Sequence, residues 1–182
     1  MGAKFEDIFA TNQFDVGRID LEHRIELSSD QPVTKAQYKV PLHYQERARA
    51  TLKAMVEENL IAEADSKYSS PALMVPKGRS DELRLVIDYR ELNKLTVEDP
   101  FPIPDMLDVV NKAARFELFS TLDIRGGYWH FQMAAEDRYK TAFVILDKQY
   151  VCNAMPMGLK NAPKTFARGL QMSTERLRST LC

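Results

Sequence analysis

The chain has 182 residues, of which 45% are hydrophobic and 28% charged, with a formal net charge of −1. This composition excludes a disordered or collagen-like chain, and the length fits one domain or part of a larger protein. No apolar run approaches the roughly 20 residues that a membrane helix needs, and no signal sequence is evident. Two cysteines, Cys152 and Cys182, cannot build a disulfide framework. We therefore expect no membrane contact, no disulfide partner, and an intracellular protein, cytoplasmic or nuclear rather than secreted.

The charge is unevenly distributed along the chain. Residues 1–66 carry a net charge of −4 and residues 67–182 one of +3. Near the C-terminus, a single acid, Glu175, stands among five bases, Lys160, Lys164, Arg168, Arg176 and Arg178. Such a tail fits a solvated helix face and an anion-contacting role equally well.

The first half of the chain predicts a leader, a helix and a hairpin. Residues 1–40 have weak periodicity and indicate an extended leader. Apolar residues at helical spacing predict an amphipathic helix over 43–59. The β-rich runs 72–75 and 83–90 flank a polar turn at 77–82, so we expect a hairpin there.

The second half alternates strands and helices. Three prolines at 100, 102 and 104 predict a stiff connector, and Pro104 suits the first turn of a helix over 104–114. Strands are expected over 116–124, near 128–133, over 141–146 and over 149–154, with a polar stretch at 135–140. A final helix should open at 161–163. Interleaved strands and helices without repeats indicate the α+β class.

Asp123 is the first candidate for chemistry because it should end a buried strand. A buried carboxylate is costly unless a cation or a hydrogen bond meets it. A metal ion is one such partner. The alternative is that Asp123 caps the turn at Gly126 and Gly127.

The predicted hairpin carries three cations, Lys77, Arg79 and Arg84. Converging Lys and Arg side chains can hold a triphosphate through charge-assisted hydrogen bonds. A basic, solvated hairpin tip explains the same spacing. Asp88 and Arg90 favour a purely local ion pair.

A compact loop over 155–163 leads into the final helix. Gly158 allows another backbone or a ligand to approach closely. Asn161 can cap the helix, whose free amides would favour an anion. The three histidines, His23, His43 and His130, share no spacing that indicates catalysis or metal binding.

Four strings, taken together, resemble a reverse transcriptase in order and spacing. They are YSSPALMVPK at 68–77, LRLVIDYRELNK at 83–94, FSTLDIRGGY at 119–128 and MPMGLKNAPKTF at 155–166. The resemblance is closest to the gypsy-type LTR-retrotransposon and retroviral branch and covers about residues 5–168. It implies the fingers and partial palm of a right-hand polymerase over residues 41–182. Residues 1–40 resemble the segment between protease and polymerase in such Pol polyproteins.

The resemblance also implies roles for individual residues. Asp123 matches the first catalytic, metal-binding aspartate of the palm, with the Ile124 carbonyl as a supporting ligand of two magnesium ions. Tyr128 matches the aromatic gate against a ribose 2′-hydroxyl. Lys77 and Arg84 match the pair that binds the incoming triphosphate.

The loop before the last helix completes the implied nucleotide site. Met157 and Gly158, with Lys160 nearby, match the loop that packs near nucleotide and template. Met157 departs from the family, where Phe or Gln is usual. The implied partners are an RNA or DNA template–primer and deoxynucleoside triphosphates.

The chain has no Asp-Asp pair, whereas the family carries a Tyr-x-Asp-Asp hairpin that supplies the other two metal carboxylates. We therefore expect a fragment truncated before that hairpin, inactive by itself and unable to hold both magnesium ions. One alternative is a non-catalytic nucleic-acid-binding or interaction module from a domesticated or degenerate retroelement. A third possibility is an unfinished fold with exposed apolar surface.

Overall fold

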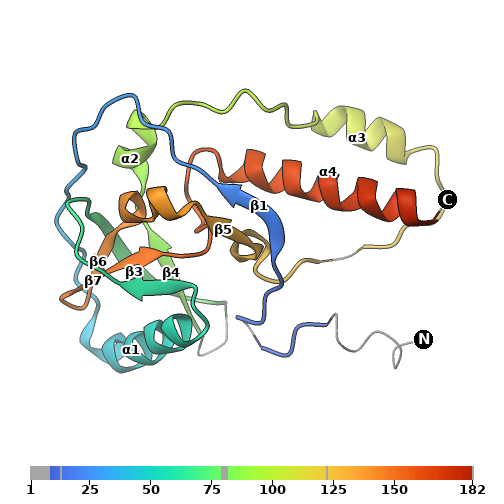
Figure 1. The fold of residues 1–182 in the computed structure, drawn as a ribbon. Helices are drawn as coiled ribbons and strands as arrows, with labels where there is room; N and C mark the ends of the chain where they lie inside the picture. Colours follow the sequence, from blue (N-terminus) through green and yellow to red (C-terminus); the bar gives the residue numbers. More distant parts are fainter. Residues whose placement is uncertain (1–8, 13, 79–81, 122, 182) are drawn as a thin grey trace.

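A five-stranded sheet, in the order β2-β7-β6-β3-β4, forms one side of the structure, on the left of Figure 1. The computed structural model describes residues 9–12, 14–78, 82–121 and 123–181, with 176–181 as helical backbone only. The strands are β2 (Ile61–Glu63), β3 (Ser70–Pro76), β4 (Leu83–Ile87), β6 (Phe143–Ile145) and β7 (Lys148–Cys152). All neighbours are antiparallel except β3 and β6. The mixture of helices and strands confirms the α+β class.

The predicted hairpin is present as β3 and β4, but its second strand is shorter than predicted. The pair runs in register from Ala72 opposite Ile87 to Pro76 opposite Leu83. The chain then leaves the sheet and forms helix α2 (Arg90–Leu95), so the strand predicted over 83–90 is wrong beyond Ile87. Tyr89 anchors this change of direction because its buried hydroxyl donates to the carbonyl of Thr141 at 2.9 Å.

Helix α1 (Leu42–Glu57) packs beside the sheet, as the spacing over 43–59 predicts (Figure 1). It buries Ala48, Leu52 and Met55. The helix stops where Asn59 takes a φ of 56°, and the chain enters β2, which the sequence did not predict. The β6–β7 turn places Leu146 and Asp147 at positive φ, so β6 ends at Ile145, and β7 ends at Cys152, two residues before the predicted end.

The leader is not simply extended, because it contributes strand β1 (Ile19–His23). This strand pairs in parallel with β5 (Phe131–Met133) to form a separate small sheet. A 3-10 helix, η3 (Gly127–His130), occupies the first part of the strand predicted near 128–133, and a second, η4 (Ala135–Thr141), occupies the predicted polar stretch. A domain boundary at residue 40 stays a prediction.

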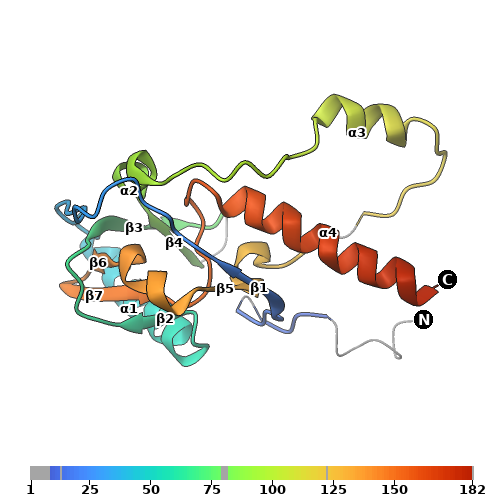
Figure 2. The same ribbon diagram turned by 45° about the horizontal axis from the view of Figure 1, so that its top comes forward.

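The long helix α4 (Ala162–Leu181) begins where predicted and extends away from the sheet (Figure 2). Gly169 lies against the fully buried Phe131, and a Cβ at this position would overlap the phenyl ring. A glycine is therefore required for α4 to approach β5. No helix in the described part of the chain is long and apolar enough to cross a membrane.

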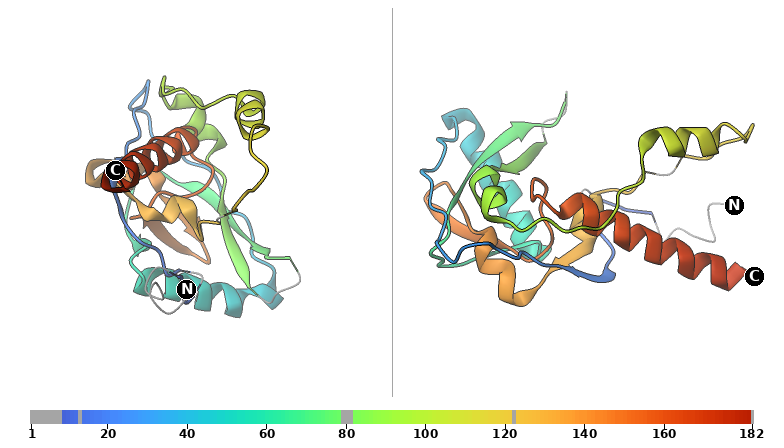
Figure 3. Two further views of the ribbon diagram at one scale, coloured as in Figure 1. Left: turned by 90° about the vertical axis from the view of Figure 1, so that its right-hand side faces the viewer. Right: turned by 90° about the horizontal axis from the view of Figure 1, so that it is seen from above.

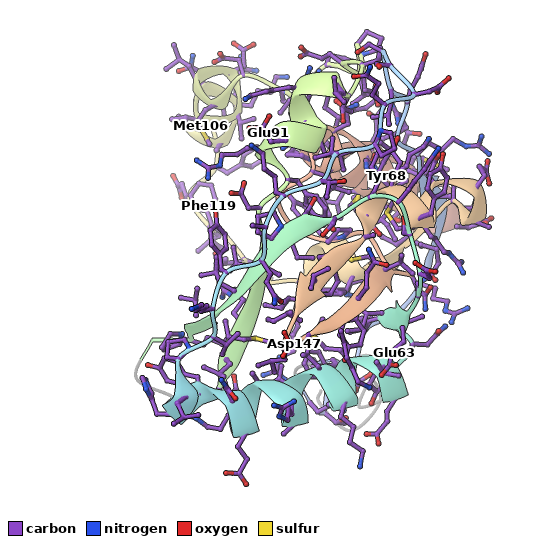
Figure 4. All side chains as sticks on the ribbon, turned by 90° about the vertical axis from the view of Figure 1, so that its left-hand side faces the viewer. Glu63, Tyr68, Glu91, Met106, Phe119 and Asp147 are labelled. Atoms are coloured by element: carbon purple, nitrogen blue, oxygen red, sulfur yellow. The ribbon has the colours of Figure 1, made fainter. Side chains whose placement is uncertain are left out.

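Helix α3 (Met106–Ala113) stands apart from the body (Figures 2 and 3). It begins after Asp105, whose side chain accepts from the amide of Leu107 at 2.7 Å, so Pro104 precedes the helix rather than opening it. No residue of α3 is buried. Figure 4 shows Met106 and Phe119 at the outer edge of the molecule, away from the sheet.

The strand predicted over 116–124 does not form in the described residues of that segment. Phe116, Leu118 and Phe119 are 66%, 92% and 67% exposed. A strand needs a neighbour for its backbone hydrogen bonds and its apolar face, and the described residues of this segment pair with none of the described strands. Leu122 lies outside the described residues.

Candidate functional site

One cavity of about 500 Å³ brings together residues that lie far apart in the sequence. It opens between the β3–β4 hairpin, the segment before η3 and the loop before α4. Five residues that the sequence analysis selected line this cavity: Lys77, Arg84, Asp123, Ile124 and Met157. Arg79, the other hairpin cation, lies outside the described residues.

Three cations line the cavity, Lys77 and Arg84 of the hairpin and Arg125 of the segment before η3. Arg84 on β4 is exposed and pairs in register with Val75 on β3. Lys77 follows β3, and its Nζ lies 3.0 Å from Glu82 Oε2 in an exposed ion pair. An exposed pair of this kind contributes little to stability, about 0–1 kcal/mol. An anionic ligand can therefore compete with Glu82 for Lys77.

Asp123 lies at the edge of the cavity, but its surroundings differ from the prediction. It is exposed and does not end a buried strand. The described residues contain no group of three His, Cys, Asp or Glu side chains that could hold a metal ion. One carboxylate and one carbonyl are too few protein oxygens to bridge and hold two magnesium ions at once. The residues present therefore do not fit two magnesium ions.

The alternative role of Asp123 as a turn cap has no support from the hydrogen bonds at η3. The N-cap position of η3 belongs to Gly126, with a φ of 60°, and not to Asp123. The positive φ explains why a glycine precedes this 3-10 helix.

Tyr128 is directed toward the core rather than into this cavity. Its ring packs edge-on against Phe166 of α4, with ring centroids 5.3 Å apart. The structure thus gives Tyr128 a packing contact between η3 and α4, and its role as a nucleotide gate stays a prediction.

Gly158 and Lys160 also lie outside the cavity that holds Asp123. Gly158 lines a separate open groove with Asp88 and Arg90, and its φ of 93° requires a glycine. A Cβ there would lie 3.4 Å from the Ile87 carbonyl oxygen, an ordinary van der Waals distance, so the backbone conformation favours glycine here and the predicted close approach stays a prediction. Lys160 Nζ donates to the carbonyl of Thr96 at 3.0 Å.

Asp88 and Arg90 form the predicted local ion pair. Arg90 Nε and Nη2 donate to the two carboxylate oxygens of Asp88 at 2.8 and 2.6 Å. The side-chain hydrogen bond from Arg90 holds the pKa of Asp88 well below its usual value. This pair is structural and sits at the rim of the open groove.

The basic residues at the start of α4 are occupied within the protein. Lys164 Nζ lies 2.9 Å from Glu98 Oε1, and Arg168 Nη2 donates to both carboxylate oxygens of Asp99 at 2.7 and 3.0 Å. Asn161 does not cap α4 with its side chain; its Oδ1 accepts from the amide of Asp99 at 3.1 Å. These bonds favour a structural role for this part of the basic tail. The side chains of Arg176 and Arg178 lie outside the described set.

Sequence reasoning missed two aromatic residues that line the cavity, Phe14 of the leader and Trp129 of η3. No local signal marked Phe14, because the leader has weak periodicity, and Trp129 stood out only as the aromatic neighbour of Tyr128.

A comparison with known protein families shows which family this chain belongs to. The family model described as "Reverse transcriptase (RNA-dependent DNA polymerase)" matches residues 75–182, more than half of the chain. The chain belongs to the reverse transcriptase family. The match includes most of the hairpin, the segment that carries Asp123, and the loop and helix that follow.

Relatives of this reverse transcriptase chain include retrovirus-related Pol polyproteins of Drosophila melanogaster. The polyprotein from transposon 297 is 34% identical over 152 residues, which are 81% of this chain and 14% of the relative. The polyprotein from transposon gypsy is 31% identical over 146 residues, 78% of this chain and 14% of the relative. The chain thus represents a reverse transcriptase domain of the gypsy-type branch and spans about one seventh of these relatives.

Solved reverse transcriptases share the fold of this chain. A crystal structure of prototype foamy virus protease-reverse transcriptase matches with a TM-score of 0.85, at 24% identity, over 96% of this chain and 24% of that one. The foamy viral enzyme in complex with an RNA/DNA hybrid matches with a TM-score of 0.83, at 21% identity and the same coverage. These matches confirm the polymerase fold predicted from the four strings.

Proposed function

We propose that this chain forms the fingers and the first part of the palm of a gypsy-type reverse transcriptase, and that its cavity receives a deoxynucleoside triphosphate. The observation that carries this proposal is the convergence of Lys77, Arg84 and Asp123 on one cavity. Two cations on one wall suit the phosphates of a nucleotide. In this proposal Asp123 is the carboxylate assigned to the primer end of the site.

An RNA or DNA template–primer is the proposed macromolecular partner. Support comes from the family membership and from the shared fold with the foamy viral enzyme, which has been solved with an RNA/DNA hybrid. The open groove beside Gly158, Asp88 and Arg90 adjoins the same hairpin and is available to such a partner.

We further propose that the 182-residue chain does not extend a primer by itself. In the family, magnesium ions activate the primer hydroxyl and stabilise the leaving pyrophosphate. The described residues offer Asp123 as a single carboxylate in the cavity, and the sequence has no Asp-Asp pair. We therefore assign no reaction step to a metal ion in this chain.

Two measurements test these proposals. Calorimetric titration with deoxythymidine triphosphate should detect binding that weakens in Arg84→Ala and is unchanged in Arg24→Ala, whose parent residue pairs with Glu136 on the surface. Primer extension with template, magnesium and deoxynucleotides should give no product. Robust extension that disappears in Asp123→Asn would overturn the proposed inactivity.

The second candidate, a non-catalytic nucleic-acid-binding module, is less well supported. The described bases of the tail that would favour it, Lys160, Lys164 and Arg168, bond to residues 96–99, which leaves the hairpin bases Lys77 and Arg84 as its support. Salt-dependent binding of an RNA/DNA hybrid without any nucleotide binding would favour this candidate over the nucleotide site.

A further inference from the structure

We propose that the leader completes the nucleotide cavity and that Phe14 is the ring against which the base of the nucleotide stacks. This inference rests on the proposed nucleotide site, and it adds a binding residue from a segment outside the four polymerase strings. Phe14 precedes β1 in the leader, yet it lines the same cavity as Arg84 and Asp123.

The leader borders the segment around Asp123 on two sides. Phe14 faces the cavity that holds the hairpin cations. Asp15, Val16 and Gly17 line an adjoining cavity that Asp123 also borders. Asp123 therefore borders two cavities, and leader residues line both of them.

A set of short hydrogen bonds holds Phe14 in this position. The amide and hydroxyl of Thr11 both donate to Asp15 Oδ2 at 2.8 Å. The amide of Phe14 donates to Asn12 Oδ1 at 2.8 Å, and Arg125 Nη1 donates to the Asn12 carbonyl at 3.3 Å. Arg125 thus fastens the leader turn to the segment that carries Asp123.

Packing supports the same placement. Phe14 and Val16 are partly buried against the hydrophobic core. A Cβ on Gly126 would lie 3.1 Å from Val16 Cγ1, so the leader lies close to the backbone of the turn before η3. The ring of Phe14 is therefore held against the body rather than free in solvent.

The cavity is lined by both cationic and aromatic side chains, the two kinds of group that a nucleotide needs. Lys77 and Arg84 offer positive charge to the phosphates, whereas Phe14 and Trp129 offer aromatic rings. Any of the four bases can stack on an aromatic side chain, because every base has a π-face. A nucleotide is a single ligand that has both an anionic and an aromatic end.

The test titrates the full chain with deoxythymidine triphosphate and, separately, with inorganic tripolyphosphate. Trp129 is the single tryptophan of the chain and lines the cavity, so its fluorescence reports occupancy alongside calorimetry. Phe14→Ala should weaken nucleotide binding about tenfold and leave tripolyphosphate binding unchanged. Phe14→Leu, which keeps the apolar bulk, should weaken nucleotide binding to a similar extent, and Phe14→Tyr should restore it.

A matched control comes from the same leader. Phe9 is 65% exposed and lines the adjoining cavity, so Phe9→Ala should bind like the parent chain. Parent-like nucleotide binding by both Phe14→Ala and Phe14→Leu would overturn the inference and leave the nucleotide site intact. Equal losses for nucleotide and tripolyphosphate would also overturn it, because they would indicate a structural role. A parent chain that binds neither ligand would overturn the nucleotide site itself.

Discussion

His23 Nδ1 lies 2.8 Å from Thr165 Oγ1, in a buried contact that joins strand β1 of the leader to helix α4. His23 is only 2% exposed. Burial lowers the pKa of His23 to about 4, against an ordinary value of 6.5, although the negative charges of Asp137 and Asp99 act in the opposite direction. The imidazole is therefore neutral in the folded protein at neutral pH.

This burial predicts a loss of stability in mild acid. Between pH 6.5 and 4 the unfolded chain binds a proton at His23 and the folded chain does not, so the free energy of unfolding falls as pH falls. With these two pKa values the loss at pH 5 is about 2 kcal/mol. Urea unfolding at pH 7 and pH 5 measures this difference.

A His23→Gln variant isolates the contribution of His23 from that of the carboxylates. Between pH 7 and pH 5, the free energy of unfolding of the variant should fall by about 2 kcal/mol less than that of the parent chain. His43→Gln is the matched control because His43 is exposed. An identical pH dependence in the parent and His23→Gln would show that His23 is not buried in the neutral form.

Asp137 is predicted to be a major stabilising residue. Its carboxylate accepts from the amide of Ile25 at 2.9 Å and pairs with Lys140, whose Nζ also donates to the Ile25 carbonyl at 2.7 Å. Asp137→Asn leaves the largely buried Lys140 without its counter-charge and should cost about 3 kcal/mol. Chemical denaturation measures the change.

The neighbouring residue provides the control for Asp137. Glu136 pairs with Arg24 where both side chains are more than half exposed, so Glu136→Gln should change stability by less than about 0.5 kcal/mol. Equal effects of Asp137→Asn and Glu136→Gln would contradict a stabilising role for the buried Asp137–Lys140 pair and its hydrogen bonds to Ile25.

The pair between Arg168 and Asp99 should hold the connector before α3 against α4. Arg168 binds both carboxylate oxygens and lies 4.5 Å from the ring centroid of Phe101. Burial by itself raises the pKa of Asp99. Hydrogen bonds from the Phe101 amide and from Arg168 lower this pKa by more than burial raises it, so the net shift is downward.

Arg168→Lys keeps the charge but loses the bidentate geometry, and we expect a loss of about 1 kcal/mol. Lys94→Ala, which removes an exposed pair with Glu91, should have almost no effect. Thermal melting of both variants decides the matter, and a parent-like midpoint in Arg168→Lys would refute the prediction.

Local patterns in the sequence predicted the elements whose partners are close in the chain or whose periodicity is strong. Helix α1 shows helical spacing of Ala48, Leu52 and Met55, and each is buried. The β3 and β4 strands flank a polar turn, and α4 has a proline, Pro163, in its first turn. In these cases local preference and tertiary packing agree.

The failures have a common physical origin in long-range contacts. Residues 116–124 have strand-like composition, but β-propensity is expressed only beside a neighbouring strand. The leader strand β1 depends on β5, more than a hundred residues away. The convergence of Lys77, Arg84 and Asp123 was expected through family resemblance alone, and no pattern indicated that Phe14 would join them.

The last prediction concerns the exposed apolar surface of α3. Met106, Leu107 and Val110 are 76%, 68% and 54% exposed, and Figure 3 shows the helix separated from α4. Exposed contiguous apolar surface promotes association. We therefore expect the isolated chain to self-associate as its concentration rises, and sedimentation velocity measures this.

Leu107→Glu combined with Val110→Glu should restore a monomer without loss of stability, because no residue of α3 is buried. The matched control is Asp108→Asn combined with Lys112→Gln, which changes exposed polar positions of the same helix and should leave association unchanged. A lower melting midpoint in the double Glu variant would mean that α3 packs against the body in solution. Association that persists in that variant would instead assign it to another surface, such as the exposed Phe116, Leu118 and Phe119.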